Sequence, residues 1–173
     1  MAQVTYANIF SEPRNNVVSL ISDSSNVSDP VSGSAENRKW IYSRVPDIKA
    51  ADFAGYPFIV INSSDLDTSI VDQSANARSK MVSFDIDIEI YTSDRGYGYE
   101  DGRGLANMEA ISDDVFETLM NVTNRNTLRG YGLAFANVEP TAISEQALKN
   151  EMTYKRIFPL TFQNRLKVSA WLK

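Results

Sequence analysis

The sequence contains neither cysteine nor histidine. Without cysteine the chain can form no disulfide and no thiolate metal site. Without histidine it lacks the imidazole that activates the nucleophile of most serine and cysteine hydrolases and that binds most transition metals. Carboxylates or lysine would have to carry any catalysis. We therefore expect a protein that is not an enzyme, with no catalytic residue, no metal and no cofactor.

Long apolar runs are missing as well. No stretch approaches the roughly 18 to 20 apolar residues that a membrane-spanning helix requires, and the first residues lack the basic start and apolar core of a signal peptide. The sequence thus predicts an intracellular start and no membrane partner. With 173 residues, of which 43% are hydrophobic, the chain is long enough for one buried core, and a single domain over residues 1–173 is expected.

The net charge of −5 is unevenly distributed. Residues 1–124 hold 9 Lys/Arg against 19 Asp/Glu, which is −10, whereas residues 125–173 hold 8 against 3, which is +5. The split is either ordinary surface variation or a sign that oppositely charged surfaces of identical copies meet head to tail in a ring. An acidic total argues against a general nucleic-acid binder, because such proteins concentrate positive charge.

Apolar and polar residues alternate almost without interruption over residues 81–91, which predicts a β-strand. One face carries five apolar side chains: Val82, Phe84, Ile86, Ile88 and Ile90. The other face carries Ser83 and a row of three carboxylates: Asp85, Asp87 and Glu89. A slip of one residue would bury the carboxylates and expose apolar groups whose burial is worth roughly 1.5 to 3 kcal/mol each. The register of this strand is therefore expected to be fixed.

Shorter patterns predict further elements. A proline in the first turn indicates a short helix over 13–22, and apolar residues at steps of three and four indicate a long helix over 105–122. Strands are expected at 40–45, 58–61, 130–139 and 152–162. The stretch 124–127 is expected to be a turn, and the connection 140–150 to hold at most one helical turn, near 145–149.

Two details of these elements are predicted from single residues. Met108 and Phe116 of the long helix are expected to lie in the core. Pro159 cannot donate a hydrogen bond within a sheet, so the strand over 152–162 is expected to be an edge strand or a bulged strand. An edge strand could pair with another copy of the protein.

Loops that we expect to be mobile lie near 22–37 and 92–104. The second holds four glycines, but their spacing fits neither the dinucleotide-binding nor the Walker pattern, so phosphate binding is not expected. Its tyrosines, Tyr97 and Tyr99, are candidates for contact with a partner, because tyrosine supplies contact area at a small entropic cost.

The order of these elements resembles that of the tail terminator and tail completion (neck) proteins of tailed bacteriophages. The resemblance lies in layout and covers most of residues 1–172. It is carried by the run Gly55-Tyr-Pro-Phe-Ile-Val-Ile61, the strand that ends in Ile-Tyr-Thr at residue 92, the helix over 105–122, and the closing Tyr154-Lys-Arg-Ile-Phe-Pro-Leu-Thr-Phe162. The loops over 22–37 and 92–104 are longer than in that family.

The resemblance implies an α+β fold in which one long helix and a shorter N-terminal helix pack against a mainly antiparallel sheet. It also implies a ring of copies, usually six, at the head-proximal end of the tail. Such rings end the growth of the tail tube, join it to the neck or connector, and leave an axial channel for the genome. The expected partners are therefore further copies of the chain, the tail tube protein, a neck, connector or head-completion protein, and DNA in non-specific passage. The expected location is the virion, after assembly in the host cytoplasm.

In a closed ring, Asp85, Asp87 and Glu89 would repeat around the axis. If they faced the channel, their negative wall would repel DNA phosphates and let the genome pass without binding. The simpler interpretation is that they keep one sheet face soluble. Asp85 and Asp87, about 6 to 7 Å apart by strand rise, could also serve a carboxylate-based enzyme or bind a hard cation. A head-completion (stopper) protein and a tail-tube subunit remain alternatives within the same machinery.

Overall fold

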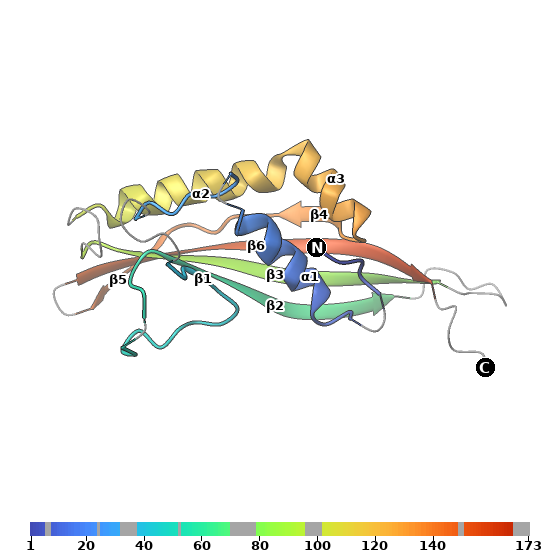
Figure 1. Ribbon diagram of the computed structural model, residues 1–173, viewed down its shortest axis with the longest axis horizontal. Coiled ribbons are helices and arrows are strands. Elements are labelled where there is room, and N and C mark those ends of the chain that lie inside the picture. The colour runs from blue at the N-terminus through green and yellow to red at the C-terminus, as the bar shows by residue number, and fades with distance from the viewer. Residues whose placement is uncertain are drawn as a thin grey trace.

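The computed structural model describes residues 1–5, 8–23, 25–31, 38–51, 53–69, 79–95, 102–148 and 151–167. In this part of the chain, three helices lie against one six-stranded sheet (Figure 1). The helices are α1 (Glu12–Ile21), α2 (Gly104–Met120) and α3 (Val122–Gly130). The strands are β1 (Ile41–Tyr42), β2 (Phe58–Ser69), β3 (Ser79–Ser93), β4 (Ala134–Val138), β5 (Ser144–Leu148) and β6 (Glu151–Lys167). The fold is α+β, as predicted.

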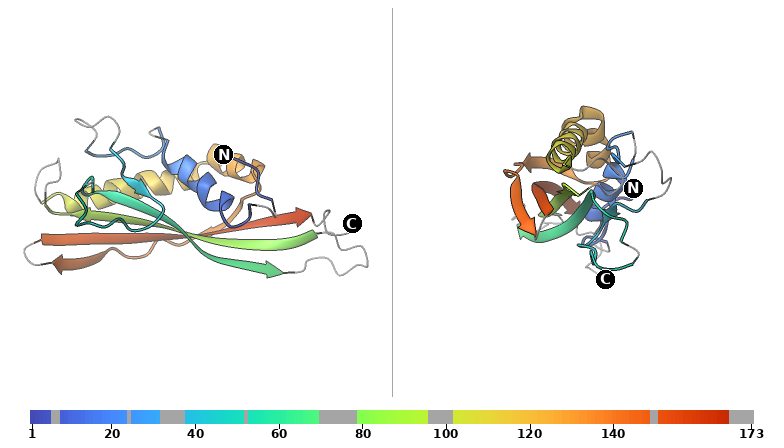
Figure 2. Two further views of the ribbon diagram at one scale, coloured as in Figure 1. Left: turned by 60° about the horizontal axis from the view of Figure 1, so that its bottom comes forward. Right: turned by 90° about the vertical axis from the view of Figure 1, so that its left-hand side faces the viewer.

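The sheet has the strand order β1-β2-β3-β6-β4, and β5 pairs with the beginning of β6. Every pair is antiparallel except β1 with β2. The two longest strands, β3 and β6, pair without a break from Ser79 opposite Lys167 to Ser93 opposite Thr153. Because strands of this length accumulate a right-handed twist, the sheet curls, and the helices lie on one side of it (Figure 2).

The predicted apolar row of β3 forms the centre of the core. At most 3% of the surface of each of its five side chains is exposed. The cluster that covers them from α1, α2 and β6 includes Val17, Leu20, Ile21, Met108, Ile111, Val115, Leu119, Phe158, Leu160 and Phe162. The alternation predicted for this strand is therefore confirmed, and the burial of these residues holds its register.

Two helices replace the single helix and turn that were predicted for residues 105–127. Asn121 interrupts the run with an extended backbone, and its side chain accepts hydrogen bonds from the backbone N–H groups of Thr123 and Asn124 at 2.9 and 3.3 Å. This is the geometry of a helix N-cap, so α3 begins where a turn was expected. Met108 is buried as predicted, but the prediction for Phe116 is wrong, since 41% of it is exposed on the outward side of α2.

The last strand is not at an edge of the sheet, because β6 pairs with β3 on one side and with β5 and β4 on the other. Pro159 is tolerated in a gap between those two short strands, whose partners are residues 151–155 and 160–163. In that gap the backbone of Ile157 bonds instead to the hydroxyl and the backbone N–H of Thr141. The helical turn predicted near 145–149 is also wrong, because these residues belong mainly to β5.

Strands β1 and β2 lie where strands were predicted, but their lengths differ from the prediction. β1 has only two residues, whereas β2 continues eight residues past the predicted end at 61. In the described part of the chain, no helix is both long and apolar enough to cross a bilayer.

Candidate functional site

The face of the sheet turned away from the helices is acidic. It carries the predicted row, half-buried: Asp85, Asp87 and Glu89. Pairing with β2 adds two aspartates, because Asp65 lies opposite Asp85 and Asp67 follows two residues later on the same strand. Residues directly opposite one another in paired strands share a face. Five acidic residues therefore occupy neighbouring positions on this face.

Positive charge is sparse beside these carboxylates. The ammonium of Lys155, from β6, lies 3.0 Å from the carboxylate of Glu89, and the hydroxyl of Tyr91 donates to the same carboxylate. Desolvation lowers the pKa of Lys155, but its hydrogen bonds to Tyr91 and Glu89 outweigh this effect, so the pKa lies above its ordinary value. Lys155 is therefore charged and neutralises Glu89. Arg156 follows Lys155 but stands opposite Ile90, in the apolar row of β3. The remaining cations of β6, Arg165 and Lys167, stand opposite residues 81 and 79, beyond the acidic stretch.

Asp87 lies at the centre of the row, between two other carboxylates. Whereas Asp85 accepts a hydrogen bond from the hydroxyl of Thr161 at 2.8 Å, Asp87 has no hydrogen bond or ion pair among the described residues. Its neighbours across the strands are an asparagine and a proline. Burial raises the pKa of Asp87, and the charges of Glu89 and Asp85 raise it further. The charge of ionised Asp87 therefore lowers the stability of the folded protein.

An aromatic cluster closes one end of the acidic face. Phe58 of β2 stacks on Tyr91 of β3, with ring centroids 4.7 Å apart. The rings of Tyr42, Phe53 and Tyr56, all within 6 Å of the Phe58 ring, pack around it. The acidic surface therefore ends where the segment between β1 and β2 covers the sheet.

That segment is held by a buried ion pair that the sequence analysis did not single out. The guanidinium of Arg38 donates two hydrogen bonds to the carboxylate of Asp29, at 2.8 and 2.7 Å. It also donates to four successive carbonyl oxygens, those of residues 54–57. Only 7% and 11% of the two side chains is exposed. Arg38 thus joins the described part of the predicted loop at 22–37 to the chain that enters β2.

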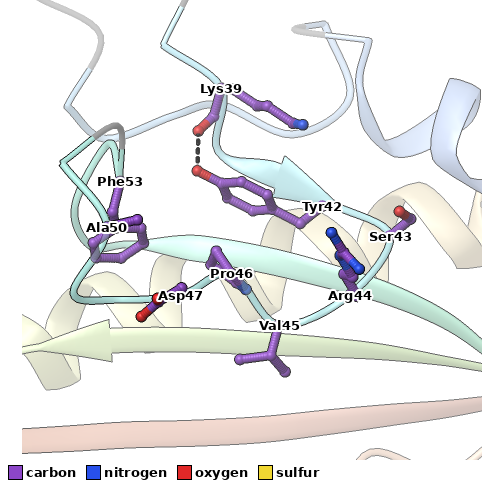
Figure 3. A pocket seen from close by; sticks show the side chains of 9 residues that line it. All are labelled: Lys39, Tyr42, Ser43, Arg44, Val45, Pro46, Asp47, Ala50 and Phe53. Atoms are coloured by element: carbon purple, nitrogen blue, oxygen red, sulfur yellow. Dashed lines mark hydrogen bonds between the residues drawn. The ribbon is translucent and has the colours of Figure 1, made fainter.

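A shallow pocket of about 470 Å³ lies in the same segment (Figure 3). Its wall holds the ring of Tyr42, whose hydroxyl donates to the carbonyl oxygen of Lys39 at 2.7 Å, and the side chains of Arg44 and Phe53. Among the described residues that line it, Asp47 is the one carboxylate, and it accepts a backbone N–H two residues later at 3.0 Å, as in a turn.

The predicted partner tyrosines, Tyr97 and Tyr99, lie outside the described residues, so their role stays a prediction. The base of their loop is described. Asp94 accepts hydrogen bonds from the N–H of Gly104 at 3.0 Å and from the hydroxyl of Tyr154 at 2.9 Å. Asp94 thereby places a carboxylate at the N-terminus of α2, where the helix dipole favours it.

The chemistry of the site is electrostatic. Within the described ranges, no three histidine, cysteine, aspartate or glutamate side chains are grouped closely enough to hold a metal ion. What the arrangement provides is a sheet face with an acidic stretch at its centre, bordered by an aromatic cluster and not covered by any described helix.

No protein-family model matches the chain, and no curated protein matches it. Among solved structures, a chain of the virion of a native gene transfer agent (GTA) particle is similar to it with a TM-score of 0.45 and 14% sequence identity. The similarity covers 92% of this chain and 100% of that chain. A TM-score this low establishes neither a common fold nor a common activity.

Proposed function

We propose that this chain is a structural protein of a phage virion that forms a ring of six copies at the head-proximal end of the tail. In this role it ends the growth of the tail tube and joins the tail to the neck or connector. Its partners are other copies of itself, the tail tube protein and a neck or head-completion protein. It acts by assembly and performs no catalysis.

The observation that carries the proposal is the excess of negative charge at the centre of the open sheet face. Like charges at opposed strand positions destabilise a sheet, yet Asp65 stands opposite Asp85. If this face needed only to be soluble, a mixture of lysines with aspartates and glutamates would be sufficient. Asp87 has the same implication, because its charge lies between those of Asp85 and Glu89, costs stability and is retained. A surface of this kind is expected where a negative potential is itself useful.

A negative potential is useful if this face lines the channel of a ring. Each copy contributes the three carboxylates of β3, of which Glu89 is paired with Lys155, so six copies surround the channel with negative charge. Duplex DNA carries about one negative charge per 1.7 Å of its length, and the wall repels it. The genome then passes without being held, and the channel-facing row is Asp85, Asp87 and Glu89.

A comparison of linear with closed circular DNA tests whether the carboxylates of β3 face the channel. The triple variant Asp85→Lys, Asp87→Lys and Glu89→Lys should turn a repelling channel into a DNA-binding one. If the lysines line a closed channel, the assembled variant should bind linear duplex DNA, which can thread the ring, and should bind closed circular DNA weakly. Binding is measured by gel shift at several salt concentrations, because contacts with phosphates weaken with salt.

A matched control carries the same charge change on the helical side. Glu109, Asp113 and Glu117 follow one another at steps of four on the exposed face of α2. Their lysine variants should bind linear and circular DNA equally, because that face is open to both. Equal binding of both DNA forms by the triple β3 variant would refute the channel placement.

A tail-tube subunit is the alternative with a distinct assembly product. Such a protein should polymerise into long tubes, whereas a terminator or a stopper should close as a single ring. Negative-stain images of the purified protein at rising concentration separate them, and tubes longer than one ring would replace the terminator proposal with the tube proposal.

A further inference from the structure

The groove between α3 and β4 combines apolar walls with two arginines that lack an acidic partner. It has a volume of about 270 Å³, and its lining includes Val122, Arg125, Arg129 and Phe135. Within the described part of the chain, neither arginine donates a hydrogen bond or forms an ion pair with a carboxylate. Helix α3 carries no acidic residue, and its two arginines, four positions apart, repel each other.

Arg125 is positioned by an aromatic ring. Its guanidinium carbon lies 5.0 Å over the ring of Phe135. The face of a guanidinium makes a contact of this kind, whereas the N–H donors lie in its plane and stay available for hydrogen bonds. The helix dipole accounts for Arg129, which lies in the last turn of α3. The dipole does not account for Arg125, which lies in the middle of the helix.

The apolar wall of the groove is uncovered. Val122, the first residue of α3, is 70% exposed. Arg125 follows three positions later and Arg129 seven positions later, so the three side chains share one face of the helix. At 1.5 Å per residue they form a row with steps of about 4.5 and 6 Å along the helix axis.

A short extended segment with one apolar and two acidic residues matches this row. On an extended chain, residues two positions apart lie on the same side and about 6.6 Å from each other. Arginine binds a carboxylate through two parallel hydrogen bonds, and apolar walls strengthen the attraction by lowering the local dielectric. The complementary pattern is therefore apolar-x-acidic-x-acidic.

The described part of this chain offers no free segment of that form. None of its described loops carries two acidic residues on one side of an extended stretch. The acidic residues of β2 and β3 belong to a broad face of paired strands, and those of α2 are on a helix about 10 to 12 Å across with its side chains. A sheet face or a helix is too wide to enter a groove of this size.

We propose that the α3–β4 groove binds an extended acidic segment of a different protein. The apolar residue of that segment covers Val122, and its two carboxylates pair with Arg125 and Arg129. The inference goes beyond the proposed function and does not require a ring, because the groove lies within one copy.

A synthetic peptide tests the groove. The probe is fluorescein-labelled Leu-Ser-Glu-Ser-Glu with an amidated C-terminus, and fluorescence anisotropy measures its binding. The wild type should bind this peptide, and it should bind Leu-Ser-Gln-Ser-Gln and Ser-Ser-Glu-Ser-Glu more weakly, because the first lacks the charges and the second cannot cover Val122. Arg125→Glu/Arg129→Glu should weaken binding at least about tenfold, because it replaces two charge-assisted contacts by repulsion.

The control Arg44→Glu/Lys49→Glu makes the same charge change on exposed side chains between β1 and β2. It should bind the peptide like the wild type, and circular dichroism checks that each variant is folded. An equal loss in both variants, equal binding of the three peptides, or no binding by the wild type would overturn the proposal.

The same variants distinguish other occupants of the groove. If Arg125→Glu/Arg129→Glu abolished self-assembly of the protein, the groove would belong to a second copy. If it abolished binding of duplex DNA and the wild type bound no peptide, the groove would belong to nucleic acid. Either result would overturn the proposal. Peptide binding by a wild type that forms no ring would support the groove and overturn only the proposed ring.

Discussion

Replacing Asp87 by asparagine should stabilise the protein, because it removes a charge that lies between two other carboxylates and keeps the shape of the side chain. Residues two positions apart on a strand are about 6.6 Å apart, and two like charges at that distance repel by about 0.6 kcal/mol in water. Asp87 has such a neighbour on each side, Asp85 and Glu89, and both raise its pKa. Lys155 offsets part of the repulsion. We therefore expect Asp87→Asn to raise the free energy of unfolding by about 0.5 to 1 kcal/mol at neutral pH.

The gain should depend on pH in a defined direction. The pKa of Asp87 in the folded protein lies above its ordinary value of 3.8, so between the two values the folded state binds more protons than the unfolded state. The destabilisation is therefore fully present above the folded pKa and is lost as the pH falls through it toward 3.8. The advantage of Asp87→Asn should shrink over the same interval.

Urea unfolding of the wild type and of Asp87→Asn, over a pH series at low and high salt, measures this effect. High salt should reduce the gain, because it screens the repulsion. Glu145→Gln, an exposed neutralisation on β5, serves as the control and should change stability by less than about 0.5 kcal/mol. A loss of stability in Asp87→Asn at neutral pH, or a gain that does not fall with pH, would refute the reasoning.

Three further substitutions test the supports of the fold by the same unfolding assay. Arg38→Met leaves the buried carboxylate of Asp29 without its partner and should cost about 3 to 5 kcal/mol; a loss below about 1 kcal/mol would mean that the pair is not needed. Gly104→Ala would place a methyl group 2.6 Å from the carbonyl carbon of Ser93 and should cost at least about 2 kcal/mol, whereas a neutral result would show that the start of α2 can shift. Asn121→Ala removes the cap of α3 and should cost about 0.5 to 2 kcal/mol, and Asn121→Asp should recover most of that loss.

The register of β3 was predictable because its two faces differ so strongly in the free energy of burial. The extent of the acidic face was not predictable. Asn62 and Asp65 are three residues apart, so simple alternation places them on opposite faces. The shift in register between Ser63 and Asp65 returns both to the acidic face, and it becomes apparent only when β2 is paired with β3.

Other features depend on contacts between residues distant in the sequence. The apolar spacing of α2 located the helix but did not show that Phe116 lies beyond the width of the buried stripe. The pairing of Arg38 with Asp29 follows no local pattern, because it depends on where two loops meet. Lys155 reaches Glu89 only through the pairing of β6 with β3, so the neutralised end of the acidic row could not be identified from the row itself.

The central claim is that the acidic face of β2 and β3 lines the channel of a closed ring. Electron cryo-microscopy of the purified, assembled protein tests it most directly. We expect single closed rings with a central hole wide enough for duplex DNA, and residues 83–89 of β3 facing the axis. Rings whose helices α1 and α2 face the hole, or open-ended filaments without a closed ring, would contradict the account.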